Sequence, residues 1–182
     1  KKFNSDTMRL TVLLALLLIT GFISPTMAQV MPKDELIFLS SEWKGERFAD
    51  GRPKISDDLL QRARKIGIEE AWTVLKNEGY KNQFEGGWKM VNDSVIVVGR
   101  VVTAQYMPSR PDVEMKIKER GKKDGRKGNT NAWPIEVLTK GDVYVADCFG
   151  KIAQGTLIGD NLGNSIFAKT GNGVIFNGAA RD

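Results

Sequence analysis

Two short apolar runs separated by a helix-like segment constrain the fold of this chain more than any other feature. Residues 143–146 and 174–176 are rich in β-branched and aromatic side chains, as expected of buried strands. Gly159-Asp160-Asn161-Leu162-Gly163 opens the segment between them, which is expected to be helical to about Thr170. The order strand, helix, strand over residues 143–177 predicts a βαβ unit, and therefore an α/β fold with some parallel pairing.

The chain before this unit is predicted to supply the rest of one domain with its own core. The apolar pattern and the capping residues predict helices over residues 56–65, 68–77, 112–120 and 133–138. Val95–Thr103 is nearly all apolar, so we expect a strand buried on both faces. Residues 29–54 are a polar lead-in, from which Trp43 and Phe48 should pack onto the domain. Residues 121–131, rich in glycine, lysine and asparagine, predict a mobile loop.

The first 28 residues have the layout of a secretion signal. Lys1, Lys2 and Arg9 precede an apolar run over residues 10–19, and Thr26-Met27-Ala28 offers small residues for cleavage. The run is shorter than the ~20 residues that a membrane span needs. We therefore expect an exported protein, periplasmic or secreted, with no stable membrane insertion after cleavage. An uncleaved anchor is the alternative.

Charge argues against a nucleic-acid partner. The whole chain has a net charge of +5. Residues 1–28 contain three basic residues and one acidic residue, so the rest of the chain has a net charge of +3. The one basic cluster, residues 116–127, is diluted by Glu119 and Asp124. We interpret it as a solvated loop rather than a surface that follows a phosphate backbone.

Composition excludes several kinds of chemistry. The sequence contains no histidine, which removes Ser-His-Asp catalysis and histidine-ligated zinc. Cys148 is the single cysteine, so an intrachain disulfide is impossible, and we expect a small buried side chain there rather than a reactive thiol. Acid–base work then falls to Asp, Glu, Lys, Tyr or a metal-bound water.

Two segments of the βαβ unit carry candidate site residues. Arg181 and Asp182 follow the second strand, and they offer a fork for a carboxylate and an oxygen ligand for a divalent cation. Gly159 and Asp160 lie at the expected helix start, where backbone N–H groups favour anions. The crossover should bring the two segments together. A surface ion pair at 181–182 and a simple helix cap at Asp160 are the alternatives.

These residues carry a family resemblance. The segments 141–147, 159–162 and 173–182 resemble the family of ribonuclease E activity regulator A (RraA) and the class II 4-hydroxy-4-methyl-2-oxoglutarate aldolases, over roughly residues 55–182. The resemblance implies a swivelling β/β/α domain with a mixed sheet that continues beyond Asp182. It also implies a homotrimer or hexamer, in which a neighbouring subunit donates an acid to the site.

The resemblance also implies roles for individual residues. Arg181 matches the substrate-binding arginine, and Asp182 matches the aspartate that holds Mg²⁺ or Mn²⁺, largely through waters. Gly159, Asn161 and Leu162 match the backbone cradle for the carboxylate of a 2-oxo acid. Asp160 matches the carboxylate that orients a metal-bound water for proton transfer.

Three functions follow from this comparison. The first is a metal-dependent lyase that releases pyruvate from a 2-oxo acid, by aldol cleavage or oxaloacetate-type decarboxylation. The others are a non-catalytic RraA-like regulator of a ribonuclease and a small-acid binding protein. The chain departs from the family at Asn177, where many members have Asp, in longer loops at 79–94 and 119–133, and in its export signal. We therefore expect a divergent subgroup.

Overall fold

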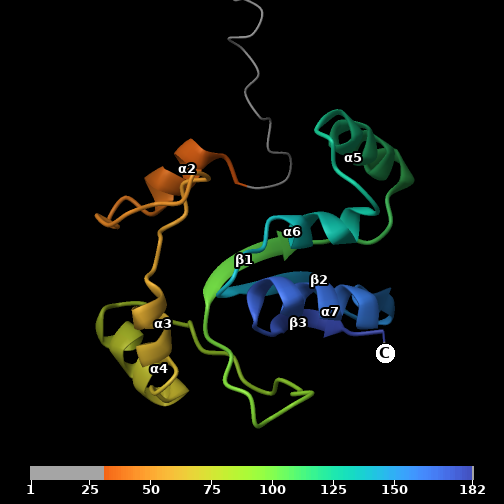
Figure 1. The fold of residues 1–182 in the computed structure, drawn as a ribbon. Coiled ribbons are helices and arrows are strands. Elements are labelled where there is room, and N and C mark those ends of the chain that lie inside the picture. Colours follow the sequence, from red (N-terminus) through yellow and green to blue (C-terminus); the bar gives the residue numbers. More distant parts are fainter. Residues whose placement is uncertain (1–30, 182) are drawn as a thin grey trace, which may run out of the picture. The chain divides into compact units, whose positions relative to one another are not determined.

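The computed structural model describes residues 31–181, so the predicted signal segment (residues 1–28) and Asp182 lie outside the described residues. Figure 1 shows the elements. They are α2 (Lys33–Leu39), α3 (Asp57–Ala63), α4 (Ile68–Asn77), β1 (Arg100–Gln105), α5 (Pro111–Lys123), the 3-10 helix η2 (Thr130–Ala132), α6 (Trp133–Glu136), β2 (Asp142–Thr156), α7 (Asp160–Thr170) and β3 (Val174–Ala179). Among residues 31–181, no helix is both long and apolar enough to cross a membrane.

The described sheet has three strands in the order β1-β2-β3, and both pairs are parallel. Helix α7 connects β2 to β3, while α5, η2 and α6 lie between β1 and β2 in the chain. The predicted βαβ unit is therefore confirmed, and with it the α/β class. The mixed sheet of a swivelling domain stays a prediction, because antiparallel pairing within residues 31–181 is limited to an isolated bridge between Arg47 and Pro53.

The core lies between one face of this sheet and the helices α6 and α7, which contact the sheet and each other (Figure 1). The parallel register aligns Val102 with Tyr144 and Tyr144 with Val174, so their side chains share that face. The buried members of the core are Val102, Ile135, Leu138, Tyr144, Ala146, Cys148, Ile158 and Ile166. Cys148 is buried as predicted, and burial raises the pKa of its thiol.

A pair of tyrosines forms a hydroxyl contact between β2 and the residue that follows β1. The hydroxyl groups of Tyr106 and Tyr144 lie 2.9 Å apart. Burial raises the pKa of both phenols, and Tyr144 is 0% exposed. The contact therefore satisfies a polar group that would otherwise be costly to bury.

The first strand differs from its prediction. The strand expected over residues 95–103 is instead β1, because pairing with β2 begins only where Arg100 lies beside Asp142. Val95 and Ile96 are 47% and 58% exposed, and Val101 within the strand is 54% exposed. The expectation of two buried faces was wrong, since an apolar run shows neither which residues pair nor what covers them.

The basic cluster also differs from its prediction. Helix α5 continues to Lys123, so most of residues 116–127 are helical rather than a loop. The helix carries two ion pairs at i, i+4 spacing, Glu114 with Lys118 at 2.6 Å and Glu119 with Lys123 at 3.0 Å. Such pairs support a solvated helix, and the helix ends in basic residues that suit its dipole.

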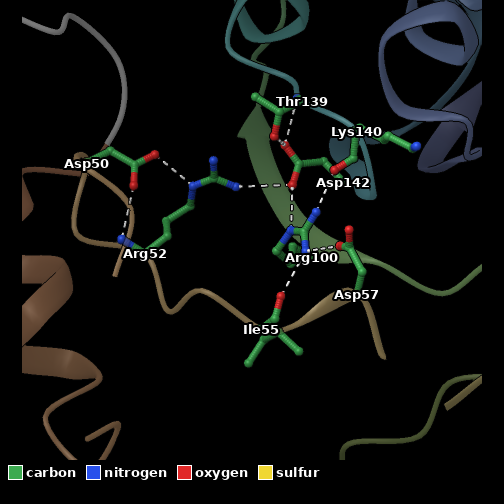
Figure 2. Close-up of polar contacts among 8 residues, drawn as sticks. All are labelled: Asp50, Arg52, Ile55, Asp57, Arg100, Thr139, Lys140 and Asp142. Atoms are coloured by element: carbon green, nitrogen blue, oxygen red, sulfur yellow. Dashed lines mark hydrogen bonds and ion pairs between the residues drawn. The ribbon is translucent and has the colours of Figure 1, made fainter. Parts of the chain in front are cut away.

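The lead-in is attached to the domain through a cluster of ion pairs, drawn in Figure 2. Asp142 is fully buried and accepts hydrogen bonds from the N–H and the hydroxyl of Thr139, at 2.8 and 2.9 Å. Its other oxygen lies 3.5 Å from Nε of Arg100 and 3.6 Å from Nη1 of Arg52. Both guanidinium groups also lie over the ring of Phe48, as expected for a residue that packs onto the domain.

Candidate functional site

The segments that follow β2 and β3 meet beside the start of α7. The N–H of Arg181 donates to the carbonyl of Ile158 at 2.8 Å, which joins the chain after β3 to the chain just before α7. This contact brings Arg181 next to Gly159, as the crossover of a βαβ unit predicts. Asp182 lies outside the described residues, so its predicted role as a metal ligand stays a prediction.

Helix α7 begins as the sequence predicts. Gly159 is its N-cap in an extended conformation, and Asp160 is the first helical residue. The carboxylate of Asp160 accepts from the N–H of Asn161 at 2.7 Å. One N–H of the predicted cradle is therefore occupied by the chain's own acid, so a ligand carboxylate must displace it or use the other N–H groups of the first turn.

The guanidinium of Arg181 faces the acid at this helix start. Nη2 of Arg181 lies 3.8 Å from Oδ1 of Asp160, and the two side chains are 62% and 68% exposed. A pair this exposed is screened by water and stabilises the fold little. The arginine can therefore turn toward a ligand at small cost.

A pocket of about 390 Å³ opens at this point. Four of the predicted site residues line it, together with two residues from the end of the preceding segment: Gly159, Asn161, Leu162 and Arg181, with Leu157 and Ile158. Asp160 does not line the pocket itself, but its carboxylate contacts two residues that do, Asn161 and Arg181. The structure thus brings the predicted substrate-binding residues together, while the role of each stays a prediction.

Another wall of the pocket was missed by sequence reasoning. Asn129, Asn131 and Ala132 line it, from the segment between α5 and α6 that was expected to be mobile. The segment is instead anchored at three points. Nδ2 of Asn131 donates to the carbonyl of Leu157 at 3.1 Å, Nε1 of Trp133 donates to the carbonyl of Lys127 at 3.0 Å, and Arg126 pairs with Glu136 at 3.0 Å.

Gly121 in helix α5 holds this segment in place by its lack of a side chain. The Trp133 ring lies against Gly121, so a Cβ at this position would overlap the ring. No local pattern predicts this contact, because glycine is unfavourable inside a helix and the sequence does not show what the helix packs against. The sequence signal for this wall was the pair of asparagines at positions 129 and 131. The composition of the segment favoured a loop, so the two residues were not predicted to line a pocket.

Gly121→Ala is expected to lower the free energy of unfolding by about 1–3 kcal/mol, because the added methyl group must displace Trp133. Gly163→Ala in α7 is the matched control, since the nearest atom to its new Cβ, on Ile158, is 4.0 Å away. That variant should gain up to about 1 kcal/mol from helix propensity. Urea unfolding measures both values, and a stabilised Gly121→Ala variant would contradict the packing described here.

Comparison with known proteins identifies the family. A model of the RraA-like family, described as aldolase/RraA, matches residues 52–182. The chain belongs to the RraA-like family. No curated protein and no solved structure matches it. The RraA-like family includes both aldolases and regulators, so membership alone does not assign a reaction.

The described part of this RraA-like chain supplies few metal ligands. Within residues 31–181, no three Asp, Glu, His or Cys side chains come close enough together to hold a metal ion. Mg²⁺ commonly takes one or two protein carboxylates and fills its remaining positions with water and substrate. Asp182 is the predicted ligand of such a sparse donor set, and Asp160 beside the pocket is predicted to orient a metal-bound water.

Asn177 lies beside another carboxylate of the RraA-like domain. Its Nδ2 donates to Oδ1 of Asp147 at 3.0 Å, and the same oxygen accepts from the N–H of Phe149 at 2.9 Å. The Asp expected here from the resemblance would place a second carboxylate against Asp147. The amide replaces that repulsion with a hydrogen bond, which is consistent with a divergent subgroup.

Proposed function

We propose that this protein is a divalent-metal-dependent lyase that cleaves a C–C bond of a 2-oxo acid and releases pyruvate. The observation that carries the proposal is the pocket in which Arg181 joins the start of α7. The hydrogen bond from the N–H of Arg181 to the carbonyl of Ile158 supports it, because it holds the two anion-binding elements together.

The two elements match the two acceptor groups of a 2-oxo acid. The Arg181 guanidinium offers parallel N–H donors that suit a carboxylate or a 2-oxo oxygen. The first turn of α7 offers backbone N–H groups and the positive end of a helix dipole, and Gly159 leaves room for close approach. Leu157 and Leu162 line the same pocket and suit the carbon chain.

Aldol cleavage balances with these groups. The C4 hydroxyl of the substrate gives up its proton, and its oxygen forms a carbonyl on C4 as the bond between C3 and C4 breaks. The C4 fragment leaves as an aldehyde or ketone, and the electron pair of the broken bond moves through C3 to the 2-oxo oxygen. A proton then returns to C3 and yields pyruvate. Arg181 stabilises the negative charge that develops on the 2-oxo group, and Asp160 is the nearby carboxylate that would relay the proton. Mg²⁺ or Mn²⁺, when bound, would withdraw electron density from the same oxygen.

The setting of the enzyme is part of the proposal. We infer an exported protein, periplasmic or secreted, on the basis of the signal-like residues 1–28. We also infer a homotrimer or hexamer, in which a neighbouring subunit completes the site with an acid. The partner is a small 2-oxo acid rather than a nucleic acid.

Metal removal tests the reaction. The full-length protein should release pyruvate from a 4-hydroxy-2-oxo acid or from oxaloacetate in the presence of Mg²⁺ or Mn²⁺, and EDTA should abolish the release until metal is restored. Lactate dehydrogenase with NADH measures the pyruvate. Isothermal titration with oxalate separates the alternatives: binding of oxalate without turnover of any acid would replace the lyase with a small-acid binding protein.

A further inference from the structure

The pocket contains a polar group that the proposed reaction does not yet use. Asn129 lines it from the segment between α5 and η2, on a different part of the chain from Arg181. Of the described residues that line the pocket, Arg181 is the one with a charged side chain. A ligand held at Arg181 would therefore meet a neutral amide elsewhere in the pocket.

The position of Asn129 is fixed by its neighbours. Lys127, two residues earlier, is held at both backbone groups: its N–H donates to Glu136 at 3.3 Å and its carbonyl accepts from Trp133 at 3.0 Å. Asn131, two residues later, is held to Leu157 by its own amide at 3.1 Å. Asn129 lies between these anchors, so its backbone is placed without any help from its side chain.

The side chain of Asn129 is exposed and makes no hydrogen bond within residues 31–181. The residue is the N-cap of η2, yet its side chain makes no capping hydrogen bond, although asparagine is among the best capping residues. The structure gives it no other hydrogen bond within that range, in contrast to Asn131. An amide that neither caps its helix nor holds its loop keeps a donor and an acceptor for a ligand in the pocket.

We propose that Asn129 is a specificity-determining residue that hydrogen-bonds the oxygen on C4 of a 2-oxo acid bound at Arg181. This rests on the proposed function, which places the carboxylate at the first turn of α7 and the 2-oxo oxygen at Arg181. Leu157 and Leu162 line the same pocket and suit the carbon chain, and in this proposal C4 faces Asn129. The amide selects acids that carry a hydroxyl or carbonyl oxygen at C4 over acids of the same length that lack it, because an amide left facing a methylene group loses its hydrogen bonds.

Two ligands that undergo no aldol cleavage test the assignment. 2,4-Dioxopentanoate carries an oxygen at C4, and 2-oxopentanoate has the same length without it. Isothermal titration of the full-length protein with Mg²⁺ gives the dissociation constant of each. Asn129→Ala should weaken 2,4-dioxopentanoate about three- to tenfold and change 2-oxopentanoate by less than about twofold. Asn77→Ala, at the exposed end of α4 and outside the pocket, should change neither.

The outcomes separate this inference from the proposed function. Equal effects of Asn129→Ala on the two acids, or no effect on either, would overturn the assignment while pyruvate release still supports the lyase. The selective effect without turnover of any acid would support Asn129 and overturn the lyase. Failure of the wild-type protein to bind either acid would overturn both.

Discussion

Asp142→Asn is expected to lower the free energy of unfolding by about 3–5 kcal/mol. Asp142 is 0% exposed, and its carboxylate lies beside Arg100 and Arg52, whose side chains are 9% and 16% exposed. The amide has nearly the same shape but no charge. Its NH₂ group must face either the arginines or the two donors of Thr139, so one donor is opposed by another. The substitution also removes the buried counter-charge of the two arginines, which keep only the more exposed Asp57 and Asp50.

Urea unfolding followed by circular dichroism measures this loss, and Asp57→Asn is its matched control. Asp57 also contacts Arg100, at 3.0 Å, but it is 79% exposed (Figure 2). Water and salt screen such a contact, so that variant should lose less than about 1 kcal/mol. Losses of similar size in the two variants would show that the buried cluster does not hold residues 50–57 to the sheet.

Arg181→Ala is expected to lower the turnover of the proposed lyase by about 10²–10³-fold, the usual effect of removing one donor that stabilises an oxyanion. The fold should be unaffected. The side chain is 62% exposed, and the backbone hydrogen bond to Ile158 does not depend on it. Initial rates of pyruvate release, with unfolding curves of the same samples, measure the two effects separately.

Two variants control for charge and for specific geometry. Arg181→Lys keeps the positive charge but loses the planar fork, so it should recover only part of the lost turnover. Arg110→Ala removes an exposed arginine that pairs with Asp112 and does not line the pocket, and it should leave turnover unchanged. Wild-type turnover in Arg181→Ala would remove the basis of the proposed mechanism.

Local pattern predicted the elements that depend on near neighbours in the chain. Helix α4 and the start of α7 were placed within about a residue, because capping residues and apolar spacing act over a single turn. The apolar run at residues 95–103 was placed less well. Its pairing depends on the position of β2, which the run itself does not encode.

The candidate site also has a part that local pattern predicted and a part that it did not. The βαβ pattern was enough to predict that Arg181 lies near Gly159, because two parallel strands joined by one helix bring the start of that helix toward the end of the next strand. The folded structure was needed to show that Asn129 lines the pocket, that Gly121 accommodates Trp133 and that Asp142 joins the lead-in to the sheet. These contacts join segments that are far apart in the sequence, so the spacing of residues within one segment does not predict them. Which side chains meet there is decided by packing and by the need to satisfy buried charge.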